Sequence, residues 1–156
     1  LVMFDRLRFF LRNSQKPVAL FIVGYSFSDE HLNDVLVENL KANPSAACFA
    51  LQYDKLAAYP IAERLAADNV NLSVLAKDAA VIRRIKAPWV AQPATDFSSI
   101  DGAFFRSNPK DQDDGNSNHA EKPYDCEFIL GGLGRLGKFL DQFSGQGISD
   151  VLESKE

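Results

Sequence analysis

The sequence predicts an α/β fold, a Rossmann-like parallel sheet flanked by helices. Short apolar runs rich in β-forming residues alternate with amphipathic helical segments along residues 2–85, the order typical of βαβ units. The run Val18–Val23 is apolar throughout, as expected for a strand covered on both faces of a sheet. The chain has 156 residues, of which 46% are hydrophobic and 24% charged, which is enough to bury one core.

The predicted elements follow one another at short spacing. Helices are expected over residues 2–13, from Asp29 to Asn43-Pro44, over 60–68 and over 79–85, and strands over 18–23, 47–53 and 70–75. Prolines delimit three of the helices: Pro17 and Pro44 end the first two and Pro60 begins the third, because proline disfavours a helical residue before it and is tolerated at a first helical position. Strands joined by helices in this order form a parallel sheet with right-handed crossovers.

The periodicity weakens after residue 90. We interpret residues 1–90 as the body of the domain and residues 91–125, which include a polar stretch at 107–123, as a partly disordered loop or insertion. An apolar stripe in residues 126–143 predicts a closing helix of the same domain. Residues 144–156 are expected to form a flexible tail.

Composition argues against several classes of function. The formal net charge is −4 and there is no basic run, which disfavours nucleic-acid binding but not a nucleotide, whose phosphates need only a local positive site. No apolar run approaches the ~20 residues of a membrane span, and the first residues do not resemble a signal peptide. The two cysteines and two histidines lack zinc-site spacing, so no metal is predicted. We expect a cytoplasmic protein, because there is no secreted disulfide pattern.

The stretch from Gly24 to His31 carries the most information about function. An apolar strand runs into a glycine, then into small polar residues and then into a helix start. Ligands of parallel sheets bind beyond the carboxyl ends of the strands, which are here residues 24–28, 52–54 and 76–79. The free amides of a first helical turn also favour anionic or hydroxyl-rich ligands.

Two interpretations of this stretch stay open. In the first it is a turn and a helix cap, since Ser26 and Ser28 are good N-cap residues and Ser26-x-x-Asp29 fits a capping box. In the second, Ser26 and the amides around Gly24 contact a phosphate or ribose, and Asp29 contacts ribose hydroxyls, because its carboxylate would repel a pyrophosphate. His31 could serve as an acid or base, although a lone histidine is more often structural.

The segment Leu20-Phe-Ile-Val-Gly-Tyr-Ser-Phe-Ser-Asp-Glu-His-Leu32 resembles the hallmark of the bacterial sirtuin-like family found in NAD-depleting antiphage defence proteins. That hallmark is a hydrophobic strand, Gly-Tyr-Ser, two variable residues and Asp-Glu-His. The resemblance covers most of residues 1–90 and part of 126–143. It implies that the chain is the C-terminal half of a sirtuin-like domain.

The same resemblance implies that NAD is the ligand. It assigns NAD contacts to Gly24, Tyr25, Ser26 and Asp29, and more loosely to Asp78 and Ala79. The family's glycine-rich loop, asparagine and catalytic histidine precede the Gly-Tyr-Ser strand and have no match in this sequence. We therefore expect the parent protein to be the enzyme, and we assign no catalytic residue here.

The implied function is the NAD-binding portion of an NAD+ glycohydrolase, which hydrolyses the nicotinamide–ribose bond and depletes NAD in antiviral defence. The expected ligands are NAD or ADP-ribose, and the resemblance also implies a HerA-type ATPase partner and a homo-oligomer. One alternative is an NAD-dependent protein deacylase of the sirtuin type, which needs the upstream histidine and usually a four-cysteine zinc module. Another is a non-catalytic nucleotide-sensing or assembly module.

A second glycine pattern lies near the end of the chain. Gly132-Leu-Gly134-Arg-Leu-Gly137 matches the dinucleotide fingerprint G-x-G-x-x-G, and residues 127–130 before it have strand character. The fingerprint also needs a following strand and an acidic residue about 20 positions on, and no second β-type run follows Gly137. We therefore interpret the pattern as a glycine-spaced closing helix.

Overall fold

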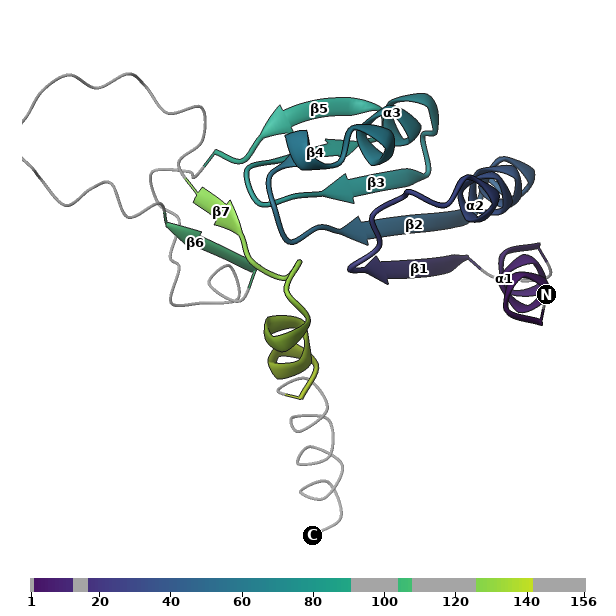
Figure 1. Ribbon diagram of the computed structural model, residues 1–156, viewed down its shortest axis with the longest axis horizontal. Coiled ribbons are helices and arrows are strands. Elements are labelled where there is room, and N and C mark those ends of the chain that lie inside the picture. Colours follow the sequence, from purple (N-terminus) through teal and green to yellow (C-terminus); the bar gives the residue numbers. More distant parts are fainter. Residues whose placement is uncertain (1, 13–16, 91–103, 108–125, 142–156) are drawn as a thin grey trace, which may run out of the picture.

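The computed structural model describes residues 2–12, 17–90, 104–107 and 126–141 (Figure 1). These residues form a five-stranded mixed sheet, a separate two-stranded sheet and several helices, which confirms the α/β class. The helices are α1 (Val2–Arg12), α2 (Glu30–Ala42), the short 3-10 helix η1 (Leu56–Ala58), α3 (Pro60–Asp68) and a helix over residues 133–141. The strands are β1 (Val18–Val23), β2 (Ala46–Leu51), β3 (Leu72–Leu75), β4 (Ala79–Ile82), β5 (Ile85–Pro88), β6 (Phe105–Ser107) and β7 (Cys126–Phe128).

The large sheet is parallel only in part. Its strand order is β1-β2-β3-β4-β5. Strand β2 pairs in parallel with β1 and with β3, as predicted, through registers such as Leu20↔Cys48 and Cys48↔Leu72. Strands β4 and β5 pair antiparallel with β3 and with each other. The sheet is therefore a parallel unit of three strands extended by an antiparallel hairpin.

The helical turns predicted over residues 79–85 are wrong, because this segment forms the β4–β5 hairpin. Arg83 and Arg84 connect the strands with φ values of 50° and 71°, and two positive φ values are what a type I′ hairpin turn requires. Asn-Gly is the usual sequence for such a turn, so an arginine pair gives no turn signal. Pairing with β3 decides the conformation, since Ala80 and Val81 become buried against the sheet.

The main core lies on the face of the sheet that the helices cover. Alternate residues of the parallel strands point to this face, including Ile22, Cys48 and Val74. They pack against Leu36 and Leu40 of α2, Leu11 of α1 and the small residues Ala62 and Ala66 of α3. All of these except Ile22 are almost fully buried. Alanines on α3 and on β2 allow helix and sheet to approach closely.

The other face is covered by the C-terminal part of the described chain. Val23, Phe49, Leu51 and Leu75 of the parallel strands pack with Trp89 and with apolar residues of 104–105 and 126–139. Trp89 is also fixed by a hydrogen bond from Nε1 to the backbone oxygen of Ala76.

No helix in the described ranges is long and apolar enough to cross a membrane.

The closing segment differs from the predicted helix over 126–143. Residues Cys126–Phe128 form β7, and the helix covers 133–141 of the described part. Phe105–Ser107, inside the predicted loop 91–125, form β6 and pair with β7. The rest of that loop and the tail 144–156 lie outside the described residues. A three-residue strand is set by its partner in space, so its own sequence carries little signal.

Cys48 should be inert in the folded protein. Its thiol is fully buried in β2, and burial raises its pKa to about 12. At pH 8 only about one thiol in ten thousand would then be ionised, and the thiolate is the reactive form. Iodoacetamide at pH 8, followed by peptide mass spectrometry, should leave Cys48 unmodified in native protein and modify it in denaturant. Stoichiometric labelling of Cys48 in the native protein would contradict this packing.

Gly131 should tolerate no side chain. A Cβ atom built on it would lie 2.0 Å from the backbone oxygen of Gln52, whereas one on Gly134 would meet nothing within 4 Å. Gly131→Ala should lower the free energy of unfolding by roughly 1–3 kcal/mol, since overpacking against backbone cannot relax easily. Urea unfolding of Gly131→Ala and of its matched control Gly134→Ala measures this. Equal midpoints for the two variants would show that residues 126–141 do not dock on β2.

Candidate functional site

Parallel pairing brings three loops to one edge of the sheet. Strands β1, β2 and β3 run in the same direction, so residues 24–28, 52–54 and 76–79 all follow carboxyl ends. Figure 1 shows the three arrowheads pointing toward the side of the molecule where β6 and β7 lie. This edge is where ligands of such sheets bind, and it holds most of the predicted site residues.

The loop after β1 is anchored by a buried aromatic ring. Phe27 is fully buried although its φ is +61°, a left-handed conformation that is uncommon outside glycine. Its ring packs on that of Tyr25, with 4.6 Å between centroids. Gly24 also has a positive φ, +72°, and a Cβ there would meet nothing within 4 Å. The buried ring thus leaves Gly24, Ser26 and Ser28 exposed above it.

Hydrogen bonds of three side chains, Tyr25, Asn33 and Gln52, fix the same loop. The Tyr25 hydroxyl lies 2.9 Å from Oδ1 of Asn33 and 3.1 Å from the backbone oxygen of Asp29, two acceptors for its one proton. Asn33 donates from Nδ2 to the backbone oxygen of Phe27 at 2.8 Å. Gln52, at the end of β2, donates from Nε2 to the backbone oxygen of Tyr25 at 3.0 Å. The loop is therefore held in one conformation before any ligand arrives.

Tyr25 acts in this loop as a neutral hydrogen-bond donor. Burial raises its pKa, and the nearby Asp29 carboxylate raises it further, while the contact with the Asp29 backbone lowers it by less. The phenol therefore keeps its proton at neutral pH. Because its hydroxyl already donates to protein acceptors, Tyr25 could make the predicted NAD contact only through its ring or its backbone.

The capping box predicted at Ser26 is not formed. The helix α2 begins at Glu30, and its N-cap is Asp29, whose Oδ1 accepts a hydrogen bond from the Leu32 amide at 3.1 Å. The Ser26 hydroxyl instead lies 2.9 Å from that of Ser28. Capping thus falls to Asp29, the stronger acceptor for a helix N-terminus, and both serine hydroxyls remain accessible.

Asp78 and Ala79 have structural roles in this conformation. Oδ1 of Asp78 accepts a hydrogen bond from the Leu56 amide at 2.8 Å, at the start of η1, and its backbone oxygen accepts from Trp89 N at 3.2 Å. Ala79 is buried at the start of β4. These contacts explain both residues without a ligand.

His31 faces helix α1 and contacts none of the other predicted site residues in the groove that it lines. It is exposed on the first turn of α2 and lines a groove of about 260 Å³ between α1 and α2. Its charged neighbours in that groove are Asp5, Arg8, Asp34 and Glu38. Because none of these neighbours is a predicted contact residue, the groove does not support His31 as an acid or base of the candidate site.

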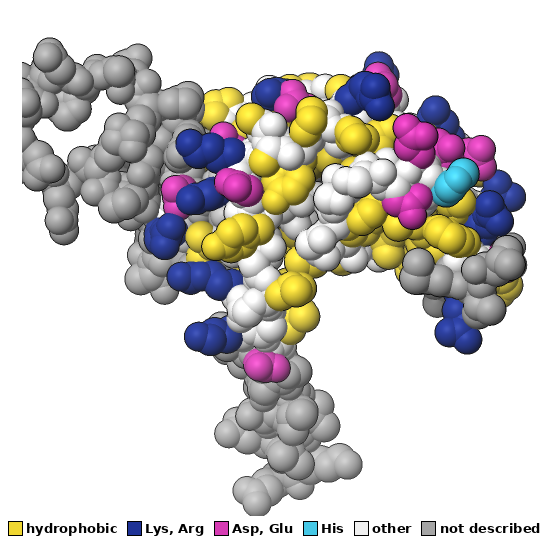
Figure 2. All heavy atoms as spheres, viewed as in Figure 1, with side chains coloured by type: hydrophobic (Ala, Val, Ile, Leu, Met, Phe, Trp, Pro, Cys, Tyr) yellow, Lys and Arg dark blue, Asp and Glu magenta, His cyan; other side chains and the backbone are white. Residues whose placement is uncertain are grey.

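A cavity of about 330 Å³ opens at the ends of β2 and β3. It is lined by Tyr53, Asp54, Lys77, Arg106, Glu127, Phe128, Ile129, Gly131, Gly132 and Arg135. The first three follow strands of the large sheet, and the others come from β6, β7, the turn after β7 and the first turn of the last helix. None of the six predicted contact residues is among them. Figure 2 shows lysine and arginine side chains gathered at this end of the molecule.

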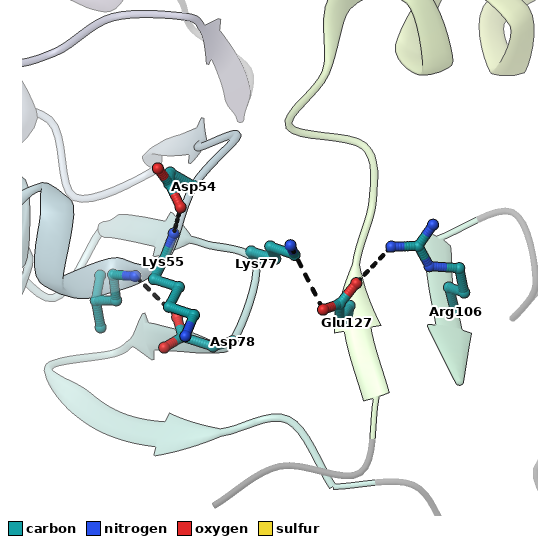
Figure 3. A network of polar contacts seen from close by, with 7 residues as sticks. Asp54, Lys55, Lys77, Asp78, Arg106 and Glu127 are labelled. Atoms are coloured by element: carbon teal, nitrogen blue, oxygen red, sulfur yellow. Dashed lines mark hydrogen bonds and ion pairs between the residues drawn. The ribbon is translucent and has the colours of Figure 1, made fainter. Parts of the chain in front are cut away.

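A buried carboxylate organises the cavity wall. Glu127 is 7% exposed, and its two oxygens lie 2.6 Å from Nη2 of Arg106 and 3.5 Å from Nζ of Lys77 (Figure 3). Burial tends to raise the pKa of Glu127, but the hydrogen bond from Arg106 and the charges of Lys77 and Arg106 outweigh it, so its pKa is lowered. The Phe128 amide also donates to the Lys77 backbone oxygen at 3.0 Å. These bonds join β7 to the end of β3.

Gln52 connects the cavity to the loop after β1. Its buried side chain binds the Tyr25 carbonyl, and its own carbonyl packs directly under Gly131. The next residue, Tyr53, lines the cavity, and its ring lies 3.5 Å from where a Cβ on Gly132 would be. The predicted loop and the cavity are thus neighbouring parts of one edge.

Sequence reasoning missed the charged residues of the cavity. Lys77 lies within a predicted strand end and Arg135 within the glycine pattern, so position alone could have suggested these two. Arg106 and Glu127 come from segments predicted as loop and helix, and their pairing across β6 and β7 has no local signal. Among the described residues no group of three or more histidine, cysteine, aspartate or glutamate side chains could hold a metal ion.

No model of a known protein family matches this chain, and no curated protein matches its sequence. The resemblance of residues 20–32 to sirtuin-like proteins therefore stays a prediction. The fold and the geometry of the strand ends are the observations on which a function can be proposed.

The ion pairs of Glu127 should make stability fall in acid. Its pKa in the folded protein is below the ordinary 4.5, so its stabilisation is complete above that value and is lost as the pH falls through the folded-state pKa. Glu127→Gln removes this titrating group. Urea unfolding at pH 7, 4.5 and 3 should show a steeper loss in the unsubstituted protein than in the variant. Parallel losses in the two proteins would contradict the assigned pairing.

Proposed function

We propose that this chain is the NAD-binding part of a sirtuin-like NAD+ glycohydrolase, an enzyme that cleaves the nicotinamide–ribose bond. The observation that carries the proposal is the rigid turn at Gly24–Ser26, exposed at the carboxyl edge of three parallel strands. It lies within residues 20–32, the segment that resembles the hallmark of that family. Preorganised polar groups beside open space bind a ligand with little ordering cost.

The sheet order is what one half of a Rossmann-like domain requires. In a doubly wound sheet of order 3-2-1-4-5-6, each half contributes three consecutive parallel strands, as β1, β2 and β3 do here, and the resemblance assigns them to the C-terminal half. Strand β1 stands at the edge of the described sheet, and Phe21 on it is 63% exposed. A first half of the domain would pair along β1 and cover this ring.

The proposed contacts follow from the chemistry of the loop. A ribose or phosphate can approach Gly24 closely because no side chain occupies the space there. The exposed Ser26 hydroxyl can donate to the ligand, and the Asp29 oxygen that does not cap α2 can accept from a ribose hydroxyl. The adenosine part would extend toward the ends of β2 and β3, where the cavity lies.

This chain would bind and orient NAD, and the parent protein would carry out the hydrolysis. That step needs stabilisation of a positively charged ribosyl species and a positioned water, and we assign neither task to a residue of this sequence. The resemblance also suggests NAD depletion in cytoplasmic antiphage defence, with a homo-oligomer and a HerA-type ATPase partner. NAD consumption by the parent protein is the direct readout of that role.

Calorimetric titration of the chain with NAD and with ADP-ribose tests the binding proposal. Both should bind, and Ser26→Ala should weaken each by about ten-fold, the loss of one hydrogen bond to a charged or polar ligand group. Ser45→Ala, an exposed serine in the turn after α2, is the matched control and should bind as the unsubstituted chain does. Absence of heat with both ligands would favour an assembly module, and unchanged binding by Ser26→Ala would remove the site assignment.

A further inference from the structure

We propose that the cavity at the ends of β2 and β3 is a binding site for the phosphate group of a small phosphorylated molecule. Three of its lining residues are cations, Lys77, Arg106 and Arg135, against two carboxylates, Asp54 and Glu127. The lining therefore has a positive balance in a chain whose formal net charge is −4. A local excess of this kind is what an anion needs.

Donors remain available after the internal ion pairs are counted. Glu127 pairs with one guanidinium nitrogen of Arg106 and with the ammonium of Lys77. A guanidinium has five N–H groups and an ammonium has three, so Arg106 and Lys77 each keep further N–H groups that can donate to a ligand. The two side chains are 54% and 36% exposed, so those groups reach solvent. Within the described ranges, Arg135 has no ion pair of its own.

Glu127 acts here as a positioning residue. Because it is buried between β6 and the end of β3, it holds the Arg106 and Lys77 side chains at fixed places on the cavity wall. Asp54 is also engaged, since its Oδ1 accepts the Lys55 amide at 2.8 Å. Both carboxylates are therefore bonded to protein groups, and the lining keeps one more positive than negative side chain.

The backbone that lines the same cavity leads into the N-terminus of a helix. Strand β7 runs through Gly131 and Gly132 into the helix over 133–141, and both glycines line the cavity. The Gly132 oxygen accepts from Arg135 N and Leu136 N, which closes the first turn of that helix. The amides at the start of such a helix point toward an anion. The glycine pattern interpreted as a closing helix therefore begins with a strand–turn–helix unit.

The size of the cavity favours a phosphate ester or diphosphate over a bare ion. At about 330 Å³ it is much larger than one phosphate group, and Tyr53 at its wall is 74% exposed. A flat aromatic ring there can stack on a sugar or base while the cations hold the phosphate. The inference does not rest on NAD as the ligand, although ADP-ribose has the required chemistry.

Calorimetry with inorganic phosphate, pyrophosphate and ADP-ribose tests the site in the full chain. Pyrophosphate and ADP-ribose should bind more tightly than phosphate, and both should weaken as salt rises. Arg135→Gln should reduce the affinity for each by roughly ten-fold or more, as for loss of one charge-assisted hydrogen bond. Arg106→Gln should do the same, and Arg64→Gln, an exposed arginine on α3, is the matched control and should change nothing.

The outcomes separate this inference from the proposed function. Arg106→Gln also breaks an ion pair, so its urea unfolding is compared with that of Arg135→Gln, whose guanidinium has no ion pair among the described residues. If pyrophosphate binds in a way that depends on Arg135 and NAD does not bind, the phosphate site is supported and the NAD proposal is contradicted. NAD binding that depends on Ser26 and is indifferent to Arg106 and Arg135, with no heat from pyrophosphate, would overturn the phosphate site.

Discussion

Parallel pairing of β1, β2 and β3 is the constraint on which the rest of the molecule depends. It places three strand ends at one edge and sends α2 and α3 back across one face of the sheet. The opposite face is then free at its carboxyl end to receive the segments around β6, β7 and the last helix. The loop after β1 and the cavity are therefore neighbours because of the parallel backbone pairing, whichever side chains they carry.

Close packing holds the loops at the carboxyl edge of the sheet in one conformation. Phe27 fills the core beneath the first loop and thereby exposes Ser26, while Gln52 links the loop to the cavity wall. Gly131 is needed because backbone of the last segment lies directly on backbone at the end of β2. Glu127 then pairs with two basic side chains of the cavity wall, Lys77 and Arg106.

Elements whose conformation depends on neighbouring residues of the chain were predicted correctly from the sequence. The apolar run at β1, the amphipathic α2 and the proline at the start of α3 were found where expected. The β4–β5 hairpin was missed because Arg83-Arg84 is an unusual turn pair that tertiary pairing imposes. Strand β6 was missed, and β7 was assigned to the closing helix although residues 127–130 have strand character, since each strand has three residues and is stabilised by its partner. The Arg106–Glu127 pair, and with it the cavity, could not be foreseen without that pairing.

Amide chemical-shift mapping of the chain with ADP-ribose tests the central claim most directly, because it reports where the ligand lies without any substitution. If the carboxyl edge is the nucleotide site, the largest shifts fall on the amides of Gly24–Ser28 and Gly131–Gly134, on the two sides of Gln52. Shifts concentrated in the groove between α1 and α2, around His31 and Glu38, or no shifts at saturating ligand, would contradict the account.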